Sequence, residues 1–199
     1  MAGEILVNGV RVTPRGNMDK VQLMSLLHGK HYQAVKEGRV FVAHAIVTAP
    51  VIYTTASGTG GPLIWNGSAD REVNVLKIGW GQTVVTTVAA ALGWTGATGQ
   101  QVAPTSTTAI DSRANLLLGG EASKATPYRV GTPLNAGTFL MPFSDVNTGA
   151  LTTTPGRTNW IDVDGLCIIP PQCWGSIAAS ATATTLVIQT CVVYEEIQL

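Results

Sequence analysis

The chain has few charged residues and no long apolar run, and both features exclude classes of protein. Charged side chains make up 12% of the 199 residues, whereas an ordinary soluble domain carries about 25%. The 12 basic residues balance the 12 acidic ones, so the chain lacks an electrostatic footprint for nucleic acid or an anionic membrane. No apolar run reaches the roughly 18 residues that span a bilayer, and the N-terminus lacks the pattern of a signal peptide. We therefore expect a soluble, non-exported chain that binds neither nucleic acid nor membrane.

Cysteine is also scarce, and its spacing argues against a metal site. Cys167, Cys173 and Cys191 are an odd number of thiols, without the CxxC spacing of zinc ligands. Buried free thiols in a reducing compartment are the expected state. A single bridge between Cys173 and Cys191 stays open, because it requires their strands to be neighbours.

Familiar catalytic and metal-binding patterns are missing as well. The chain has no GxSxG, HExxH or Walker-type motif. His28 and His31 stand at helical spacing, but two imidazoles do not make a metal site. The DVDG sequence at 162–165 lacks the distal Glu of a calcium loop, so we expect a tight turn between strands. Glu195 and Glu196 are adjacent, so in a strand they point to opposite faces and cannot act as a glycosidase pair. We expect no enzyme activity, cofactor or metal.

The N-terminal part carries two local signals. Residues 4–12 alternate apolar side chains around Asn8-Gly9, which predicts a β-hairpin. A hairpin this short is marginal alone, so it packs either on its own chain or on a neighbouring subunit, and both alternatives stay open. Residues 18–43 are then the only segment with the pattern of a sustained, charged helix, interrupted at Gly29 and ended at Gly38.

The basic residues of this helical segment are Lys30, Lys36 and Arg39, and the first 50 residues are the most positive part of the chain. These side chains could complement an acidic partner surface. A solvated helix face explains them equally well. The segment is therefore a candidate docking element, without a unique interpretation from charge alone.

From residue 45 onward the chain is rich in Thr, Ala, Gly and Val, and it lacks further apolar patterns of helical period. Candidate strands follow Arg39 and recur at 72–80, 83–88, 126–143 and 158–169, while Gly93 to Ser123 has the composition of long loops. Residues 173–180 and 185–197 predict a closing hairpin. The pattern predicts an all-β, antiparallel β-sandwich of the jelly-roll-like kind, with one N-terminal helical segment. We divide the chain into an arm and helical docking segment at 1–44 and a sandwich domain at 45–199.

Five tryptophans stand out among the few aromatic residues. Trp65, Trp80 and Trp174 lie within apolar strand candidates, so we expect them in the core. Trp94 is flanked by glycine and threonine in the loop-like region, so we expect it to be exposed or at an interface. Exposed aromatic side chains could also form a platform for stacking sugars.

Two stretches resemble a recurrent pattern in structural proteins of tailed bacteriophages, in which an N-terminal helical piece precedes a jelly-roll-like domain. They are LLHGKHYQAVKEGRVF (26–41) and PLIWNGSADREVNVLKIGWG (62–81). The resemblance implies a non-enzymatic virion protein of the capsid decoration or cement type, assembled in the host cytoplasm. It implies contacts with the major capsid protein and with copies of the chain itself, as a trimer. The alternative is a carbohydrate- or receptor-binding β-sandwich module of a phage tail. The residues that we expect to contact partner or sister subunits are Leu27, His28, Lys30, Tyr32, Lys36, Arg39 and Trp94.

Overall fold

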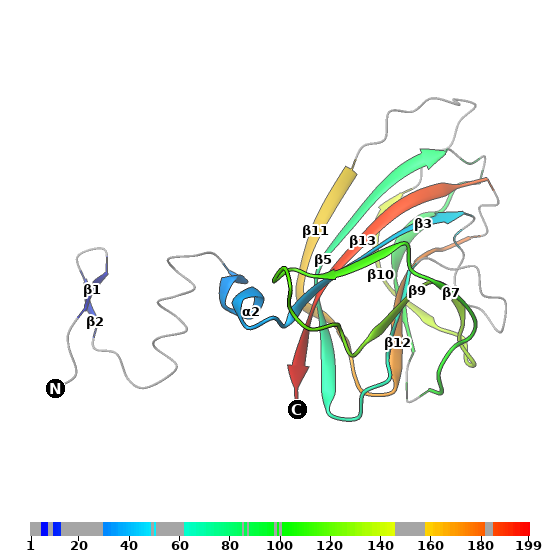
Figure 1. Cartoon of the computed structure of the whole chain (residues 1–199). Helices are drawn as coiled ribbons and strands as arrows, with labels where there is room; N and C mark the ends of the chain where they lie inside the picture. Colours follow the sequence, from blue (N-terminus) through cyan, green and yellow to red (C-terminus); the bar gives the residue numbers. More distant parts are fainter. Residues whose placement is uncertain are drawn as a thin grey trace.

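The computed structural model of the chain shows, in the residues that it describes, two large antiparallel β-sheets packed face to face, with one short helix on the outside (Figure 1). This confirms the expected all-β sandwich. The structure describes residues 5–7, 10–12, 30–48, 50, 62–84, 86, 88–97, 99, 101–145, 158–181 and 185–199. No helix in this described part is long and apolar enough to cross a bilayer.

The N-terminal elements agree in part with expectation. Strands β1 (Ile5–Val7) and β2 (Val10–Val12) pair antiparallel and confirm the hairpin. Within the described residues, the expected helix at 18–43 is reduced to α2 (Tyr32–Lys36), and residues 18–29 lie outside them. The helix ends before Gly38, whose φ of +71° suits glycine. Residues 40–43 are strand and not helix, because β-branched and aromatic side chains there enter the sheet.

Each sheet is assembled from strands that are distant in sequence. The six-stranded sheet runs in the order β10 (Thr138–Asp145), β6 (Ala91–Gly96), β12 (Cys173–Ala179), β4 (Leu63–Asn66), β9 (Thr126–Thr132) and β7 (Thr105–Ala109). The five-stranded sheet runs in the order β11 (Thr158–Ile169), β5 (Arg71–Val84), β13 (Val187–Gln198), β3 (Val40–Thr48) and β8 (Ser112–Asn115). The division expected between residues 44 and 45 falls within β3.

The strand order is that of a jelly roll. Without β7, β8 and β9, the two sheets reduce to β3-β13-β5-β11 and β4-β12-β6-β10. The chain then crosses between the sheets at every step except from β6 to β10, which gives two interlocked Greek keys. The strands β7 to β9 form an insertion that extends both sheets on the β3 and β4 side. One expectation was wrong: β12 and β13 do not form a hairpin, because they belong to different sheets.

The main core fills the space between the two sheets. On β5 and β13, alternate side chains such as Ile78 and Val192 point inward and are fully buried. The rings of Trp80 and Phe143 meet across the core at 4.7 Å. Trp65 and Trp174 are also buried, in a separate apolar cluster with Leu63, so all three strand tryptophans are buried as expected.

The expectation that Trp94 is exposed was wrong. Trp94 lies on β6, between β10 and β12, and only 2% of its surface is exposed. A Cβ added to Gly175 would lie 2.3 Å from the Trp94 ring, so glycine makes room for the indole. The glycines and threonines at 93–96 therefore belong to a buried strand, and β7 and β8 likewise interrupt the long loops expected from 93 to 123.

All three cysteines are free thiols, as expected. Cys173 is on the six-stranded sheet and Cys191 is on the five-stranded sheet. The bridge that the sequence left open is absent.

Candidate interaction surface

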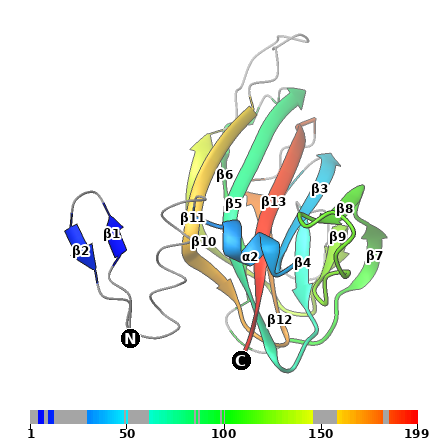
Figure 2. The ribbon, with the colours of Figure 1, turned by 60° about the vertical axis from the view of Figure 1, so that its left-hand side comes forward.

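Helix α2 lies on the outer face of the five-stranded sheet, over β5 and β13 (Figure 2). Val40 points to this face because its neighbour Phe41 points into the main core. The helix buries Ala34 against Val40 and Leu76, and Val193 packs at the margin. A second, smaller apolar cluster therefore holds α2 on the outside of the sandwich.

Two basic residues at the start of α2 are anchored by one carboxylate. Lys30 forms an ion pair with Asp164, and Nε2 of His31 lies 3.3 Å from Oδ1 of Asp164. The Lys30 side chain is 64% exposed, and exposed pairs of this kind contribute about 0–1 kcal/mol. The contact positions the start of the helix more than it stabilises the fold.

Asp164 reaches α2 because β11 is interrupted by a bulge. The pairing of β11 with β5 shifts between Asp162 and Cys167, and Asp164 and Gly165 have φ values of +35° and +89°. The DVDG sequence is therefore a bulge within one strand and not the expected turn between strands. Oδ1 of Asp162 pairs with Nζ of Lys77 at 2.9 Å, and this hydrogen bond lowers the pKa of Asp162 below its usual value.

The basic residue after the helix is also neutralised within the chain. Arg39 pairs with Glu195 on β13, and its Nη2 lies 2.7 Å from Oε2 of Glu37. Hydrogen bonds from Gln33 and then from Arg39 lower the pKa of Glu37. Lys36 makes no ion pair with any described residue, and its Nζ lies 5.8 Å from the centre of the Tyr32 ring. Of the three basic side chains expected to meet a partner, Lys30 and Arg39 are paired within the chain, whereas Lys36 has no ionic partner among the residues that the structure describes.

Beside α2 lies an apolar hollow of about 350 Å³. One wall is Trp160, whose side chain is 53% exposed. Its ring lies over Gly79, where an added Cβ would be 2.9 Å from the indole. The exposed tryptophan is thus Trp160 and not Trp94. The side chains that line the hollow are His31, Val35, Val40, Leu76, Lys77, Leu116, Trp160 and Val193.

Next to the hollow, three consecutive leucines form an exposed turn, which we call the leucine turn (residues 116–118). Leu116, Leu117 and Leu118 are 41%, 39% and 91% exposed. The Asn115 amide donates to the carbonyl of Gly38 at 2.8 Å and accepts from the backbone N–H of Leu117 at 2.8 Å. The turn is therefore tied to the end of α2, although its side chains face solvent.

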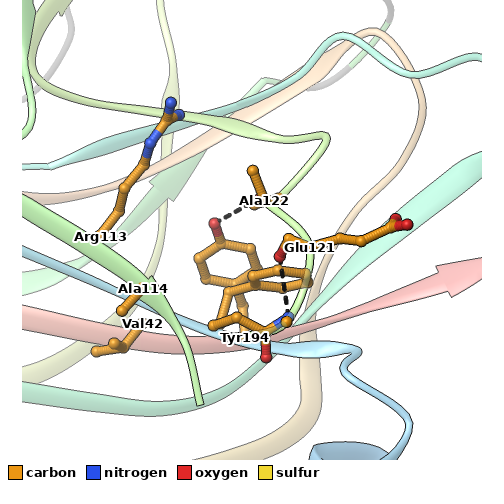
Figure 3. Close-up of a pocket in the computed structure, with 10 residues that line it drawn as sticks. Val42, Arg113, Ala114, Glu121, Ala122 and Tyr194 are labelled. Atoms are coloured by element: carbon orange, nitrogen blue, oxygen red, sulfur yellow. Dashed lines mark hydrogen bonds between the residues drawn. The ribbon is translucent and has the colours of Figure 1, made fainter. Parts of the chain in front are cut away.

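A second pocket, of about 230 Å³, lies behind the leucine turn (Figure 3). Tyr194 lies at its centre, and the charged ends of Arg113 and Glu121 point away from that ring. The Tyr194 hydroxyl is 2.8 Å from Oγ of Ser123, which donates to Glu196 at 2.6 Å. These polar groups already satisfy one another, so they hold the chain together and do not converge on a ligand.

The structure brings four of the predicted contact residues together on or beside α2. Lys30, Tyr32, Lys36 and Arg39 all belong to α2 or its ends. Leu27 and His28 lie outside the described residues. Trp94 is buried, so it presents no surface to a partner.

Sequence reasoning missed Trp160 and the leucine turn. A signal for the turn was present, because LLLGG is an apolar run next to glycines in a Thr-rich region. The signal for Trp160 was weaker. Side chains alternate between the two faces of β11, but the sequence alone does not show which face points into the core.

Within the described ranges, no group of three or more His, Cys, Asp or Glu side chains is placed to hold a metal ion. Comparisons of the chain with protein-family models, with characterised proteins and with solved structures find no match.

Proposed function

We propose that the chain is a non-enzymatic virion structural protein of the tailed-phage capsid decoration type. In this role it binds the major capsid protein and other copies of itself, and it stabilises the shell as a small oligomer. The observation that carries the proposal is the apolar surface beside α2, which combines the hollow, the exposed Trp160 and the leucine turn. Exposed apolar clusters of this kind mark protein contacts.

The chemistry of this surface supports contact with protein. Trp160 and Leu118 offer large apolar area on a fixed backbone, and buried aromatic anchors typically dominate binding energy at interfaces. Most of the charge around them is paired within the chain, so little unpaired charge has to lose its water on association. The low overall charge fits a chain whose surface is partly covered in an assembly.

The jelly-roll strand order is compatible with the phage resemblance, because viral capsid domains are among the proteins that use it. The same order occurs in lectins, so fold alone does not assign a role. The surface beside α2 is what favours the structural role.

The second candidate is a carbohydrate- or receptor-binding module, and Trp160 is the observation in its favour. A sugar platform needs several exposed aromatic rings near polar groups. Among the described residues, Trp160 is the one large aromatic side chain that is more than half exposed. If this candidate holds, the chain binds glycans and Trp160→Ala abolishes that binding.

The test uses phage particles that lack the chain. Purified chain is added to particles from a deletion mutant of the phage that encodes it, and bound copies are counted after sedimentation. We expect saturable binding to the shell, strongly weakened by Trp160→Asp and unchanged by Leu134→Asp. Leu134 is 65% exposed and lies outside the hollow and the leucine turn. Absence of binding, or binding to tails alone, would contradict the proposal.

A further inference from the structure

We propose that the hollow beside α2 is filled by the leucine turn of a second copy of the chain, and that each copy of the pair both gives and receives a turn. The inference rests on the proposed function, since it names the neighbour that covers the surface assigned there to protein contact. It adds the partner, the contact residues and the symmetry.

The hollow and the turn match in chemistry and size. Val35, Leu76, Trp160 and Val193 give the hollow an apolar wall. A cavity of about 150 Å³ can hold a benzene molecule, so a hollow of about 350 Å³ has room for a leucine side chain. Leu118, at 91% exposure, is the most exposed of the large apolar side chains in the described chain.

Hydrogen bonds fix the conformation of the leucine turn. Asn115 fixes it with three hydrogen bonds, which include one from its amide to the carbonyl of Glu121 at 3.0 Å. The N–H of Gly120 donates to the carbonyl of Leu117 at 2.8 Å and closes the turn. A fixed turn loses little conformational entropy on binding, and this favours association.

The position of the turn sets the symmetry of the contact. Leu116 begins the turn and also lines the hollow, so the projection and the recess lie side by side on one face. Two copies related by a two-fold axis can then insert both turns at once, as in an isologous contact. Each pair closes on itself and leaves the rest of the sandwich free for the shell.

Charge complementarity points to the same partner. Glu121 follows the leucine turn by three residues, and its exposed carboxylate makes no ion pair with any described residue. Lys36 directly follows Val35, which lines the hollow, and its ammonium group lacks an ionic partner among the described residues. When a turn enters the hollow of another copy, Glu121 of one chain can meet Lys36 of the other.

The first test is the mass of the purified chain by sedimentation equilibrium over a range of concentrations. We expect a dimer for the native chain and a dissociation constant raised at least roughly 30-fold by Leu118→Asp, since truncated anchors weaken contacts on this scale. Leu134→Asp, the matched control, leaves the constant unchanged. A native monomer, a native trimer, or equal association of both variants would overturn the inference.

The second test is specific to the charge pair between chains. Lys36→Glu and Glu121→Lys each weaken self-association about tenfold or more, because they oppose like charges. An equimolar mixture of the two variants restores association, since each mixed pair contains two attractive contacts. If the mixture stays as weak as the separate variants, the proposed contact is wrong.

The two tests separate this inference from the proposed function. A monomeric chain that still binds deletion particles through Trp160 would overturn the second-copy contact and leave the virion role standing. A native dimer that is weakened by Leu118→Asp but binds no particles would support the second-copy contact and overturn the virion role.

Discussion

Removal of the buried carboxylate of Glu196 should destabilise the fold strongly. Only 2% of Glu196 is exposed, although it is a charged residue near the end of β13. Its Oε1 accepts hydrogen bonds from Oγ of Ser123 at 2.6 Å and from the backbone N–H of Ala125 at 2.9 Å. Nη1 of Arg71 lies 3.6 Å from its Oε2. This one side chain therefore ties the segment after the leucine turn to the five-stranded sheet.

The expected loss follows from these contacts. In Glu196→Ala the buried N–H of Ala125 loses its acceptor, and a buried polar group without a partner costs about 1–3 kcal/mol. The hydroxyl of Ser123 loses one hydrogen bond but keeps the carbonyl of Ala125 at 2.9 Å and the Tyr194 hydroxyl at 2.8 Å as partners. Arg71 loses its counter-charge as well, but its side chain is 31% exposed, so this loss adds about 1 kcal/mol at most. We expect the free energy of unfolding to fall by about 2–4 kcal/mol, a large fraction of the roughly 5–15 kcal/mol of a typical domain.

The assay is denaturant unfolding followed by tryptophan fluorescence, and Glu195→Ala is the matched control. Glu195 is the adjacent residue on the opposite face of β13, where it pairs with the partly exposed Arg39. Its loss should cost no more than about 1 kcal/mol. Equal losses for the two variants, or a loss below about 1 kcal/mol for Glu196→Ala, would refute the reasoning.

Three further predictions concern the core. Gly175→Ala should lower the free energy of unfolding by about 1–3 kcal/mol, because the new methyl group would lie 2.3 Å from the Trp94 ring; an unchanged thermal midpoint would contradict this. Burial raises the pKa of Tyr194 from 10.0 to about 12, so its contribution to stability, on the order of 3 kcal/mol, is present below pH 10 and is lost as pH rises to 12. Denaturant titrations should therefore show a shallower alkaline decline in the stability of Tyr194→Phe. Burial also raises the pKa of the Cys167 thiol to about 11, so iodoacetamide should label it at pH 8 only after unfolding. Rapid labelling of Cys167 in the native chain would contradict its buried position.

The fold class could be predicted because strands have a local signal in the sequence, which is their composition. Val40–Thr48 and Arg71–Val84 are rich in β-branched residues, and no helical pattern separates them. Pairing is a non-local property, so the sequence could not show that β12 and β13 cross between sheets. A hairpin was the simpler prediction for two consecutive strands.

The candidate surface was harder to predict than the fold. The helix residues Lys30 and Lys36 were recognised from charge, but the carboxylate that neutralises Lys30 lies far along the chain on the β11 bulge. Trp94 was misplaced because glycine next to an aromatic residue is typical of loops, whereas here Gly175 of the neighbouring strand makes room for the ring. Local composition does not reveal which backbone a large side chain will lie against.

The most direct test of the proposed virion role is a cryo-electron microscopy map of phage particles to which the chain has been added. The account predicts jelly-roll density on the outside of the shell, with Trp160 and the leucine turn buried between neighbouring subunits. Density for the chain at the tail, or on the shell with this surface facing solvent, would contradict it.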